Sequence, residues 1–294
     1  MNMAEEMRLH SDGRHYSLED KVNVGCHDCS GCTDCCRTTG DSIILNPRDM
    51  FYLTIGLEKK FEDMIEKEIE IRLVDGLILP NIMETDEKHP ELPEGCRFLT
   101  PEGRCGIHSF RPDLCRLFPV ARVYQNDVES DKDVNQDGGM SSSRGGSRDG
   151  NNIDASQYGG KERNKYVSKA VNVYGSKNGS KNNGRNGEKG SHYYMVQVDQ
   201  CSKPYAEHYP VRLQEWIGIP DREKKAYTEF VQTWHDFCRI TGPKTYILSE
   251  KLANQVRNYI LHVFFVMPWN KGQAFYPQFY ARLDKVRREL NLRI

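Results

Sequence analysis

The feature that most constrains this chain is a dense run of cysteines at residues 25–37, GCHDCSGCTDCCR. Small and polar residues separate these cysteines. Thiolates two residues apart in such a loop can reach a common point without straining the backbone, so they can bind one ion or one cluster. The run therefore predicts a cysteine-ligated metal centre.

The run can be matched to metal-binding patterns in two ways. In the first, the C-x2-C-x2-C-x3-C spacing of bacterial ferredoxins is reproduced, with Arg37 in place of the usual proline. In the second, the pattern is CxxCxxCC, and the first cysteine is an extra. Both cannot hold for one cluster, and the sequence leaves both open. The two sets are Cys26, Cys29, Cys32 and Cys36, and Cys29, Cys32, Cys35 and Cys36.

Adjacent cysteines are awkward ligands for one tetrahedral ion, because neighbouring side chains usually diverge. We therefore expect either Cys35 or Cys36 to serve a second centre, to bridge metals, or to pack inside. Candidates for a second centre follow at Cys96, Cys105 and Cys115. Their spacings are unspecific, and small buried hydrophobic side chains are the alternative interpretation.

The sequence also indicates the cellular compartment, which bears on whether the cysteines bind metal. The start of the chain is polar and acidic where a signal peptide would be basic and then apolar. The longest apolar stretch, residues 259–267, is far shorter than the roughly 20 residues needed to cross a bilayer. We expect a cytoplasmic protein with no membrane partner. In a reducing compartment, ten cysteines favour metal ligands or redox groups over disulfides.

The charge balance excludes a global attraction to nucleic acid. The chain carries 41 basic and 42 acidic residues, for a formal net charge of -1. A basic group formed by Lys285, Arg287, Arg288 and Arg293 is better explained as a solvated helix face. The predicted partner is a metal ion or cluster, and no protein partner can be named.

The middle of the chain, residues 126–191, collapses in composition to Gly, Ser, Asn, Asp, Lys and Arg. Such a tract cannot bury enough apolar area to offset chain entropy, so a disordered insertion is predicted. Its flanks, residues 120–125 and 192–198, are β-branched and aromatic and should pair as neighbouring strands. The tract is then an enlarged hairpin loop. An interdomain linker is the alternative.

Apolar spacing predicts several helices. Residues 46–49 (NPRD) should cap a helix through Leu53, and a second helix should run over residues 57–73. Three apolar stripes after residue 221 predict C-terminal helices with ordinary core faces. The expected fold class is α+β. Its parts are a polar tail (1–24), a small cysteine-cluster domain (25–125 plus 192–220), the disordered insertion (126–191) and a helical region (221–294).

The order of these motifs resembles a known family. CxxCxxCC is followed by SIILNPRDM and then by CRFLTPEGRCGIHSFRPDLCRLFP, as in the YkgJ-like cysteine-cluster family, whose domain is described as zinc- or iron-chelating. The resemblance covers residues 26–125 and 193–204. It implies eight metal-ligating cysteines, which in this chain are Cys29, Cys32, Cys35, Cys36, Cys96, Cys105, Cys115 and Cys201.

Two departures from the family pattern are Cys26, which is additional, and His108, which stands where a tyrosine is usual. Either could be an extra ligand, or neither. Cys238 lies beside Phe237 on an apolar helix stripe and is predicted to be core. His27 lies in the cluster loop, where a solvent-facing position is favoured over ligation.

Arginines near the cysteines should tune the thiols. We expect Arg37, Arg111 and Arg116 to flank the thiolates and to lower their pKa values. The competing interpretation is that Arg111 and Arg116 cap helices or cover the surface.

The bound group should be an iron-sulfur cluster or zinc. The partial ferredoxin spacing slightly favours the cluster, whereas zinc would hold the small fold together. The first function class is a metal-binding module without catalysis. The alternative is a protein-modifying or redox enzyme, because flagellin lysine N-methylases share the CxxCxxCC domain. The sequence weakens this alternative, since it contains no Gly-rich nucleotide fingerprint and no C-x3-C-x2-C motif.

Overall fold

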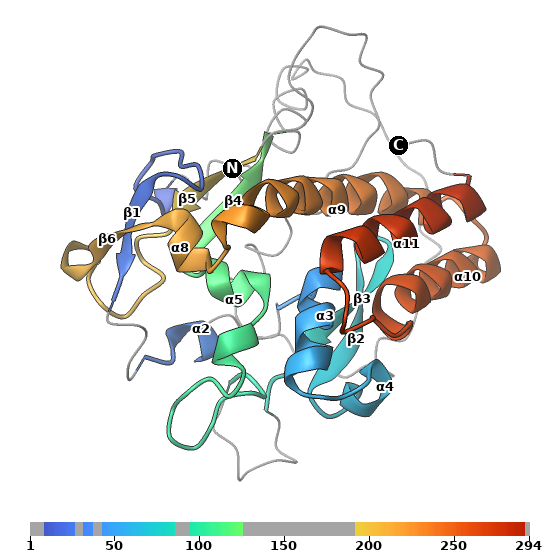
Figure 1. Cartoon of the computed structure of the whole chain (residues 1–294), viewed down its shortest axis with the longest axis horizontal. Helices are drawn as coiled ribbons and strands as arrows, with labels where there is room; N and C mark the ends of the chain where they lie inside the picture. Colours follow the sequence, from blue (N-terminus) through green and yellow to red (C-terminus); the bar gives the residue numbers. More distant parts are fainter. Residues whose placement is uncertain (1–8, 27–31, 38–42, 86–94, 126–191, 292–294) are drawn as a thin grey trace, which may run out of the picture.

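Three two-stranded antiparallel sheets and a set of helices make up the chain in the computed structural model, and the fold class is α+β, as predicted (Figure 1). The structure describes residues 9–26, 32–37, 43–85, 95–125 and 192–291. The sheets pair β1 (Lys21–Gly25) with β6 (Tyr209–Arg212), β2 (Ile69–Val74) with β3 (Leu77–Ile82), and β4 (Val120–Tyr124) with β5 (His192–Val196).

The pairing of β4 with β5 confirms the prediction that the two flanks of the central tract are neighbouring strands. Val120 lies opposite Val196, and Tyr124 lies opposite His192. The tract predicted as a disordered insertion, residues 126–191, lies outside the described residues. The two stretches of the predicted cysteine-cluster domain are thus joined by backbone hydrogen bonds.

His192, at the start of β5, gives this hairpin a pH dependence. Burial, together with the charge of Arg122, lowers the pKa of His192 to about 4, whereas an unfolded histidine titrates near about 6.5. The neutral ring contacts Gln232 and Tyr194 through its two nitrogens, each at 3.3 Å. Because the folded pKa is the lower one, His192 stabilises the fold above pH ~6.5, and this contribution is lost as the pH falls toward ~4.

Between pH ~6.5 and ~4, the free energy of unfolding should therefore decrease less in the His192→Gln variant than in the wild type. The difference should be at most about 3 kcal/mol. Urea unfolding at a series of pH values measures this slope. A variant whose slope equals that of the wild type would contradict the assignment.

The segment predicted as a polar tail, residues 1–24, is part of the fold where the structure describes it. Ser11 and Tyr16 form β-bridges with Gln197 and Tyr194. Strand β1 begins within the predicted tail, and its Val22 is buried. The tail prediction is wrong for residues 9–24. The segment was predicted as a tail because most of its residues are polar, although a few apolar side chains, such as Leu18 and Val22, are buried by tertiary contacts.

The predicted cap is confirmed at α3 (Pro47–Gly56). The Asn46 side-chain oxygen accepts hydrogen bonds from the Arg48 and Asp49 amides at 2.8 and 3.0 Å, and the Asp49 carboxylate accepts one from the Asn46 amide at 2.9 Å. This reciprocal arrangement satisfies amides that the first helical turn leaves unpaired. It also buries Asp49 at the start of the helix.

The second helix predicted over residues 57–73 is wrong for most of its length. Only α4 (Phe61–Met64) is helical, and the chain then forms the β2–β3 hairpin. Its turn is Asp75-Gly76, with φ values of 47° and 86°, which is the Asp-Gly signature of a type I′ turn. Ile69 is fully buried while Leu73 is 58% exposed, so the helix-like spacing did not correspond to one buried face.

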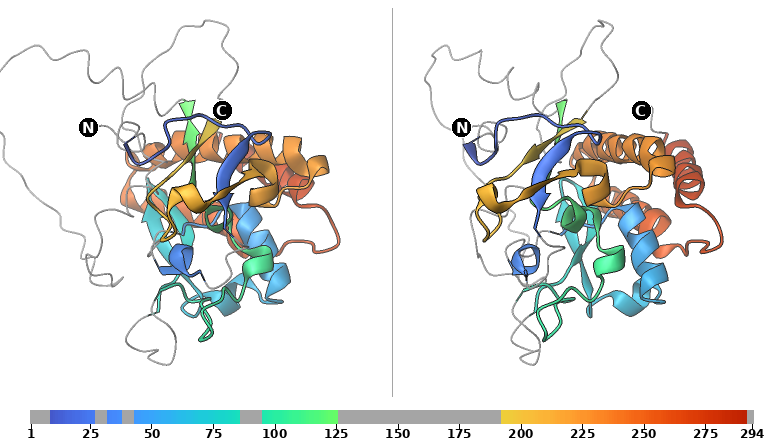
Figure 2. Two further views of the ribbon diagram at one scale, coloured as in Figure 1. Left: turned by 90° about the vertical axis from the view of Figure 1, so that its left-hand side faces the viewer. Right: turned by 60° about the vertical axis from the view of Figure 1, so that its left-hand side comes forward.

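The C-terminal helices are confirmed. After α8 (Leu213–Ile217), the chain forms α9 (Lys224–Thr245), α10 (Glu250–Leu261), a π-helical turn (His262–Val266) and α11 (Phe275–Glu289). The predicted stripes are largely buried, although Leu252 is 45% exposed. Figures 1 and 2 show α9, α10 and α11 together at one side of the molecule and the β1–β6 sheet at the other. No described helix is both long enough and apolar enough to cross a membrane.

One continuous hydrophobic core connects the sheets and the C-terminal helices. It contains Leu18 and Val22 near the N-terminus, Leu117 and Val120 near the middle, and Val286 on α11. The core therefore crosses the predicted boundary at residue 220. Cys36 and Cys96 belong to this core, so the cysteine cluster is continuous with it.

Candidate metal centre

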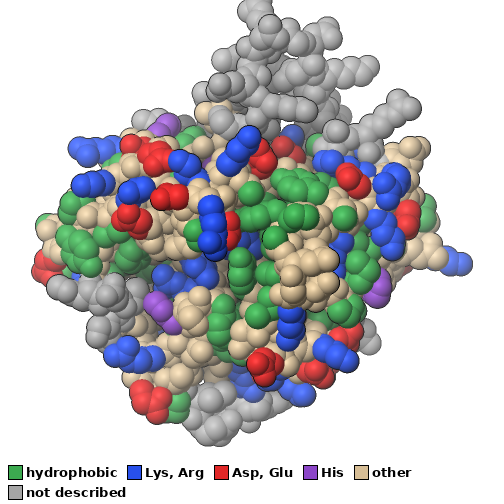
Figure 3. All heavy atoms as spheres, in the orientation of Figure 1, with side chains coloured by type: hydrophobic (Ala, Val, Ile, Leu, Met, Phe, Trp, Pro, Cys, Tyr) green, Lys and Arg blue, Asp and Glu red, His purple; other side chains and the backbone are tan. Residues whose placement is uncertain are grey.

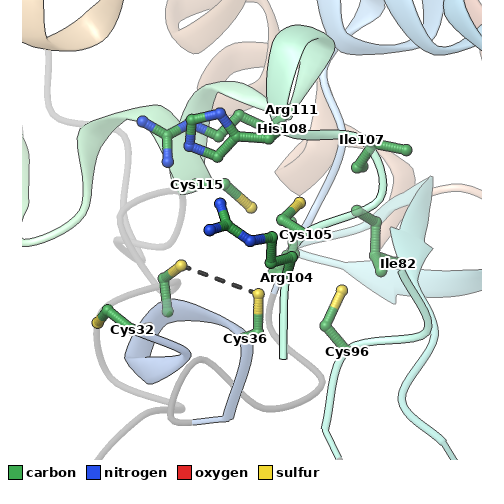
Figure 4. A pocket seen from close by; sticks show the side chains of 12 residues that line it. Cys32, Cys36, Ile82, Cys96, Arg104, Cys105, Ile107, His108, Arg111 and Cys115 are labelled. Carbon is green, nitrogen blue, oxygen red and sulfur yellow. Dashed lines mark hydrogen bonds between the residues drawn. The ribbon is translucent and has the colours of Figure 1, made fainter. Parts of the chain in front are cut away.

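Three elements that are separate in the sequence converge on a pocket of about 210 Å³ that is rich in thiols. They are α2 (Asp34–Arg37), the loop at residues 95–107, and α5 (Asp113–Leu117). In Figure 4 the sulfur atoms of Cys36, Cys96, Cys105 and Cys115 surround one space. The full lining is Cys32, Cys35, Cys36, Ile43, Ile82, Cys96, Arg104, Cys105, Ile107, His108, Arg111 and Cys115.

Backbone contacts hold these elements together. The Cys96 amide donates to the Cys36 carbonyl at 2.7 Å, which ties α2 to the loop. A Cβ on Gly95 would lie 2.4 Å from that carbonyl, and the φ of Gly95 is +122°, so glycine is required there. The loop then folds back on itself, because Leu99 and Cys105 form a β-bridge. The cysteine positions are thus fixed by backbone hydrogen bonds.

Because neighbouring side chains usually diverge, we expected the side chains of Cys35 and Cys36 to point apart. In the structure they converge. Their sulfur atoms lie 3.9 Å apart. With a zinc–sulfur bond of about 2.3 Å, two ligands of a tetrahedral ion lie about 3.8 Å apart. Because α2 has only four residues, no preceding turn restricts the side-chain rotamers. The two sulfur atoms are therefore close enough to share one ion, while Cys36 is also buried in the core, so the expectation that one of them bridges metals, serves a second centre or packs inside stays a prediction.

The protonation of the thiols is uneven. A hydrogen bond from Cys36, together with the positive charge of Arg111, outweighs burial and lowers the pKa of Cys105 to about 7. Hydrogen bonding to Cys105 raises the pKa of Cys36, hydrogen bonding to Cys36 raises that of Cys35, and burial raises that of Cys115. Cys105 is thus the thiol that ionises first, and a bound metal would displace the remaining protons.

Of the three predicted arginines, Arg111 lies at the pocket. Its positive charge contributes to the lowered pKa of Cys105. At Cys35 and Cys115 it only partly offsets the hydrogen bonding and burial that raise the pKa. Arg116 instead donates to the backbone carbonyls of Arg111 and Ile217, which fits the competing interpretation. Arg37 donates to the Thr33 hydroxyl at 3.1 Å and is exposed.

Two further basic side chains, Arg104 and His108, line the pocket beside Arg111 (Figure 4). Basic side chains and a histidine gather over the region of α5 on the face shown in Figure 3. Arg104 was missed by sequence reasoning, although its position next to Cys105 was the available signal. These charges would offset the negative charge of a multi-thiolate site.

The other predicted ligands lie outside this group of thiols. Cys32 lines the rim of the pocket, but its sulfur points away from the other sulfurs in Figure 4. Cys26 is buried and lies close enough to Cys32 to raise its pKa, after the larger effect of burial. Cys201 is half-buried and is not part of the lining. Cys29 and His27 lie outside the described residues.

Cys238 is buried on α9, as predicted for a core residue.

The donor set fits a soft transition metal. All six cysteines that line the pocket belong to the eight that the family resemblance implies. Thiolates select zinc and iron over magnesium and calcium, which prefer oxygen. Among the described residues, no three His, Cys, Asp or Glu side chains already stand in the geometry of a ligand shell. The thiols are gathered, and side-chain rotation would have to bring them onto an ion.

A buried polar network lies directly behind α5, and sequence reasoning did not find it. The Asp113 carboxylate accepts hydrogen bonds from Tyr227 at 2.5 Å and from Arg122 at 2.8 Å. The Asp113 amide donates to the Asp49 carboxylate at 2.8 Å. Although burial opposes it, the charge of Arg122 lowers the pKa of Asp113, whereas burial raises that of Asp49 to about 7. The network joins α3, α5, β4 and α9 two residues from Cys115.

Comparison with known proteins agrees with this geometry over part of the chain. Residues 28–137 match the model of the CxxCxxCC family, described as "Putative zinc- or iron-chelating domain". The matched stretch contains all the cysteines that line the pocket, and it confirms the resemblance seen in the motifs. The description states chelation and no enzyme activity. Neither the curated proteins nor the solved structures gave a match.

Proposed function

We propose that this protein chelates a zinc or iron ion through Cys35, Cys36, Cys96 and Cys105, because residues 28–137 match the model of a zinc- or iron-chelating domain. The main support is the position of Cys36, which lies beside three other thiols. Its sulfur is 3.9 Å from that of Cys35, and hydrogen bonds with Cys105 and Cys96 contribute to its raised pKa. Cys115 supplies a fifth thiol at the wall formed by α5. The centre is structural, since it links α2 to the loop at residues 95–107.

The short distance between Cys35 and Cys36 favours one ion over an iron-sulfur cluster. On one tetrahedral ion two thiolates share the same metal, whereas in a cubane cluster each cysteine binds a different iron. In the ferredoxin spacing the fourth cysteine, here Cys36, can serve a different cluster from the first three, so that spacing does not account for the contact between Cys35 and Cys36. We therefore place a mononuclear zinc first and iron second.

Metal analysis of Cys36→Ala tests the proposal. The full chain is purified without oxygen, and its metal content and visible spectrum are recorded. The wild type should be colourless with stoichiometric zinc. Cys36→Ala should lose the ion of the pocket, because Cys36 is the thiol that contacts three others.

Cys238→Ala is the matched control, because Cys238 is equally buried but lies on α9 in the core. It should keep the metal content of the wild type. A brown protein containing iron and sulfide would show that the centre is an iron-sulfur cluster and that the zinc assignment is wrong. A folded wild-type protein without any metal would overturn the proposed function.

A further inference from the structure

Three basic side chains line the thiol pocket together with the cysteines. They are Arg104 in the loop at residues 95–107, His108 in a short helical turn (His108–Phe110), and Arg111 just before α5. Figure 4 shows the charged ends of all three on the side of the pocket away from Cys96. None of the described residues that line the pocket is an aspartate or a glutamate. The wall therefore carries positive charge that no carboxylate of the lining neutralises.

The guanidinium groups of Arg104 and Arg111 have no partner within the described part of the chain. Arg104 uses its backbone amide, which donates to the Thr100 hydroxyl, and Arg111 uses its backbone carbonyl, which accepts from Arg116. Neither guanidinium forms an ion pair with a described residue or donates to a described oxygen or sulfur atom. A guanidinium has five N–H donors in a planar fork that fits two oxygens of a carboxylate or phosphate. These donors are therefore available to an oxyanion.

Backbone contacts hold this wall in place before any ligand binds. Arg116, on α5, donates to the carbonyl oxygens of Ser109 and Arg111 at 3.3 and 2.8 Å, so it fixes the turn that precedes α5. In the loop, the Thr100 amide donates to the Arg104 carbonyl at 2.8 Å. Binding of an anion then orders side chains and no backbone, which keeps the entropy cost of binding low.

The charge of the wall also suits an ion bound by the thiols, a step that rests on the proposed function. A divalent ion held by four thiolates leaves two excess negative charges, and the two guanidinium groups offset them. An approaching anion therefore meets no net negative charge. It meets the N–H donors first, because Arg104 is exposed and Arg111 is half-buried, whereas Cys36 and Cys96 are buried.

The size of the pocket limits what the anion can be. Pockets for typical small-molecule ligands have a volume of about 300–1,000 Å³. This pocket has about 210 Å³, and it also contains the thiols that would hold the ion. It therefore fits a single carboxylate or phosphate group, either as a small anion or as the charged end of a small molecule.

We propose that Arg104, His108 and Arg111 form an oxyanion site beside the chelated ion, and that this site binds the carboxylate or phosphate group of a small molecule. The guanidinium groups donate charge-assisted hydrogen bonds to the oxygens, and His108 adds an N–H donor. Arg116 is a positioning residue, since it holds the turn and does not line the pocket. His108, which departs from the family pattern, becomes part of this site.

Calorimetric titration of the full chain tests the site, with inorganic phosphate and succinate as two separate ligands. Low ionic strength is used, because salt screens exposed charges. The wild type should bind one equivalent of at least one ligand, and the tighter ligand identifies the oxyanion. Loss of charge-assisted hydrogen bonds should weaken binding about tenfold or more in Arg104→Gln and in Arg111→Gln. The zinc content of the same samples should equal that of the wild type.

Two further variants separate the shape of the side chain from its charge. Arg111→Lys keeps the positive charge but loses the planar fork, so it should keep zinc and still bind the anion more weakly than the wild type. Arg288→Gln removes an exposed arginine on α11 and is the matched control. It should leave both the zinc content and anion binding unchanged.

The outcomes separate this site from the proposed function. A zinc-loaded wild type that binds neither ligand, or equal binding in Arg111→Gln, would overturn the oxyanion site and leave the chelated ion standing. The site would also be wrong if Arg111→Gln loses zinc, Arg111→Lys keeps it and neither binds an anion, because the arginine then only offsets the thiolates. A wild type that binds the anion but contains no metal would overturn the proposed function instead, since the donors of this site are arginine and histidine.

Discussion

Asp113→Ala is expected to lower the free energy of unfolding by about 3–5 kcal/mol, because removing one partner of a buried ion pair leaves the other charge uncompensated. The side chains of Asp113 and Arg122 are only 5% and 10% exposed. Without Asp113, the guanidinium of Arg122 and the hydroxyl of Tyr227 both lose an acceptor. Urea unfolding followed by far-UV circular dichroism measures the difference.

Removing both charges together distinguishes the interaction between Asp113 and Arg122 from the penalty of leaving Arg122 buried without its partner. In Asp113→Leu/Arg122→Met both charges are removed, so the loss should be smaller than in Asp113→Ala. Asp284→Ala is the control for removal of a carboxylate, because Asp284 is exposed on α11, and it should change stability by less than about 0.5 kcal/mol. An Asp113→Ala variant as stable as this control would show that the network contributes nothing.

Removal of the metal is expected to lower the melting temperature by about 8–16 °C. A ligand present at a thousand times its dissociation constant contributes about 4 kcal/mol, and each kcal/mol shifts the melting temperature of a domain of this size by about 2–4 °C. Treatment with a chelator, followed by a thermal scan, measures the shift. Readdition of zinc should reverse it.

The loss should be local as well as global. Hydrogen exchange in the chelated protein should increase first at α2 and in the loop at residues 95–107, which the thiols of Cys35, Cys36, Cys96 and Cys105 connect. Helices α9 and α11 should stay protected, because aromatic side chains such as Phe230, Trp234 and Phe279 pack them together. Uniform exchange with an unchanged melting temperature would mean that the ion does not support the fold.

Features that depend on local sequence were predicted well. The cap at Asn46, the pairing of β4 with β5 and the three C-terminal helices follow from short-range patterns that the tertiary structure kept. The helix predicted over residues 57–73 failed because its spacing also suited a strand, and the Asp75-Gly76 turn decided between them. Where two local patterns compete, the contacts made by the rest of the chain select one.

By itself, the sequence determined the chemistry of this protein: its thiol content, the order of the cysteine motifs and the α+β class. Only the tertiary structure decided which side chains meet. It gathered Cys35 and Cys36 with Cys96, Cys105 and Cys115, and it turned Cys32 away from them. It also placed Asp113 against Arg122 and Tyr227. These partners are distant along the chain, and their meeting depends on the packing of a shared core, which no local spacing encodes.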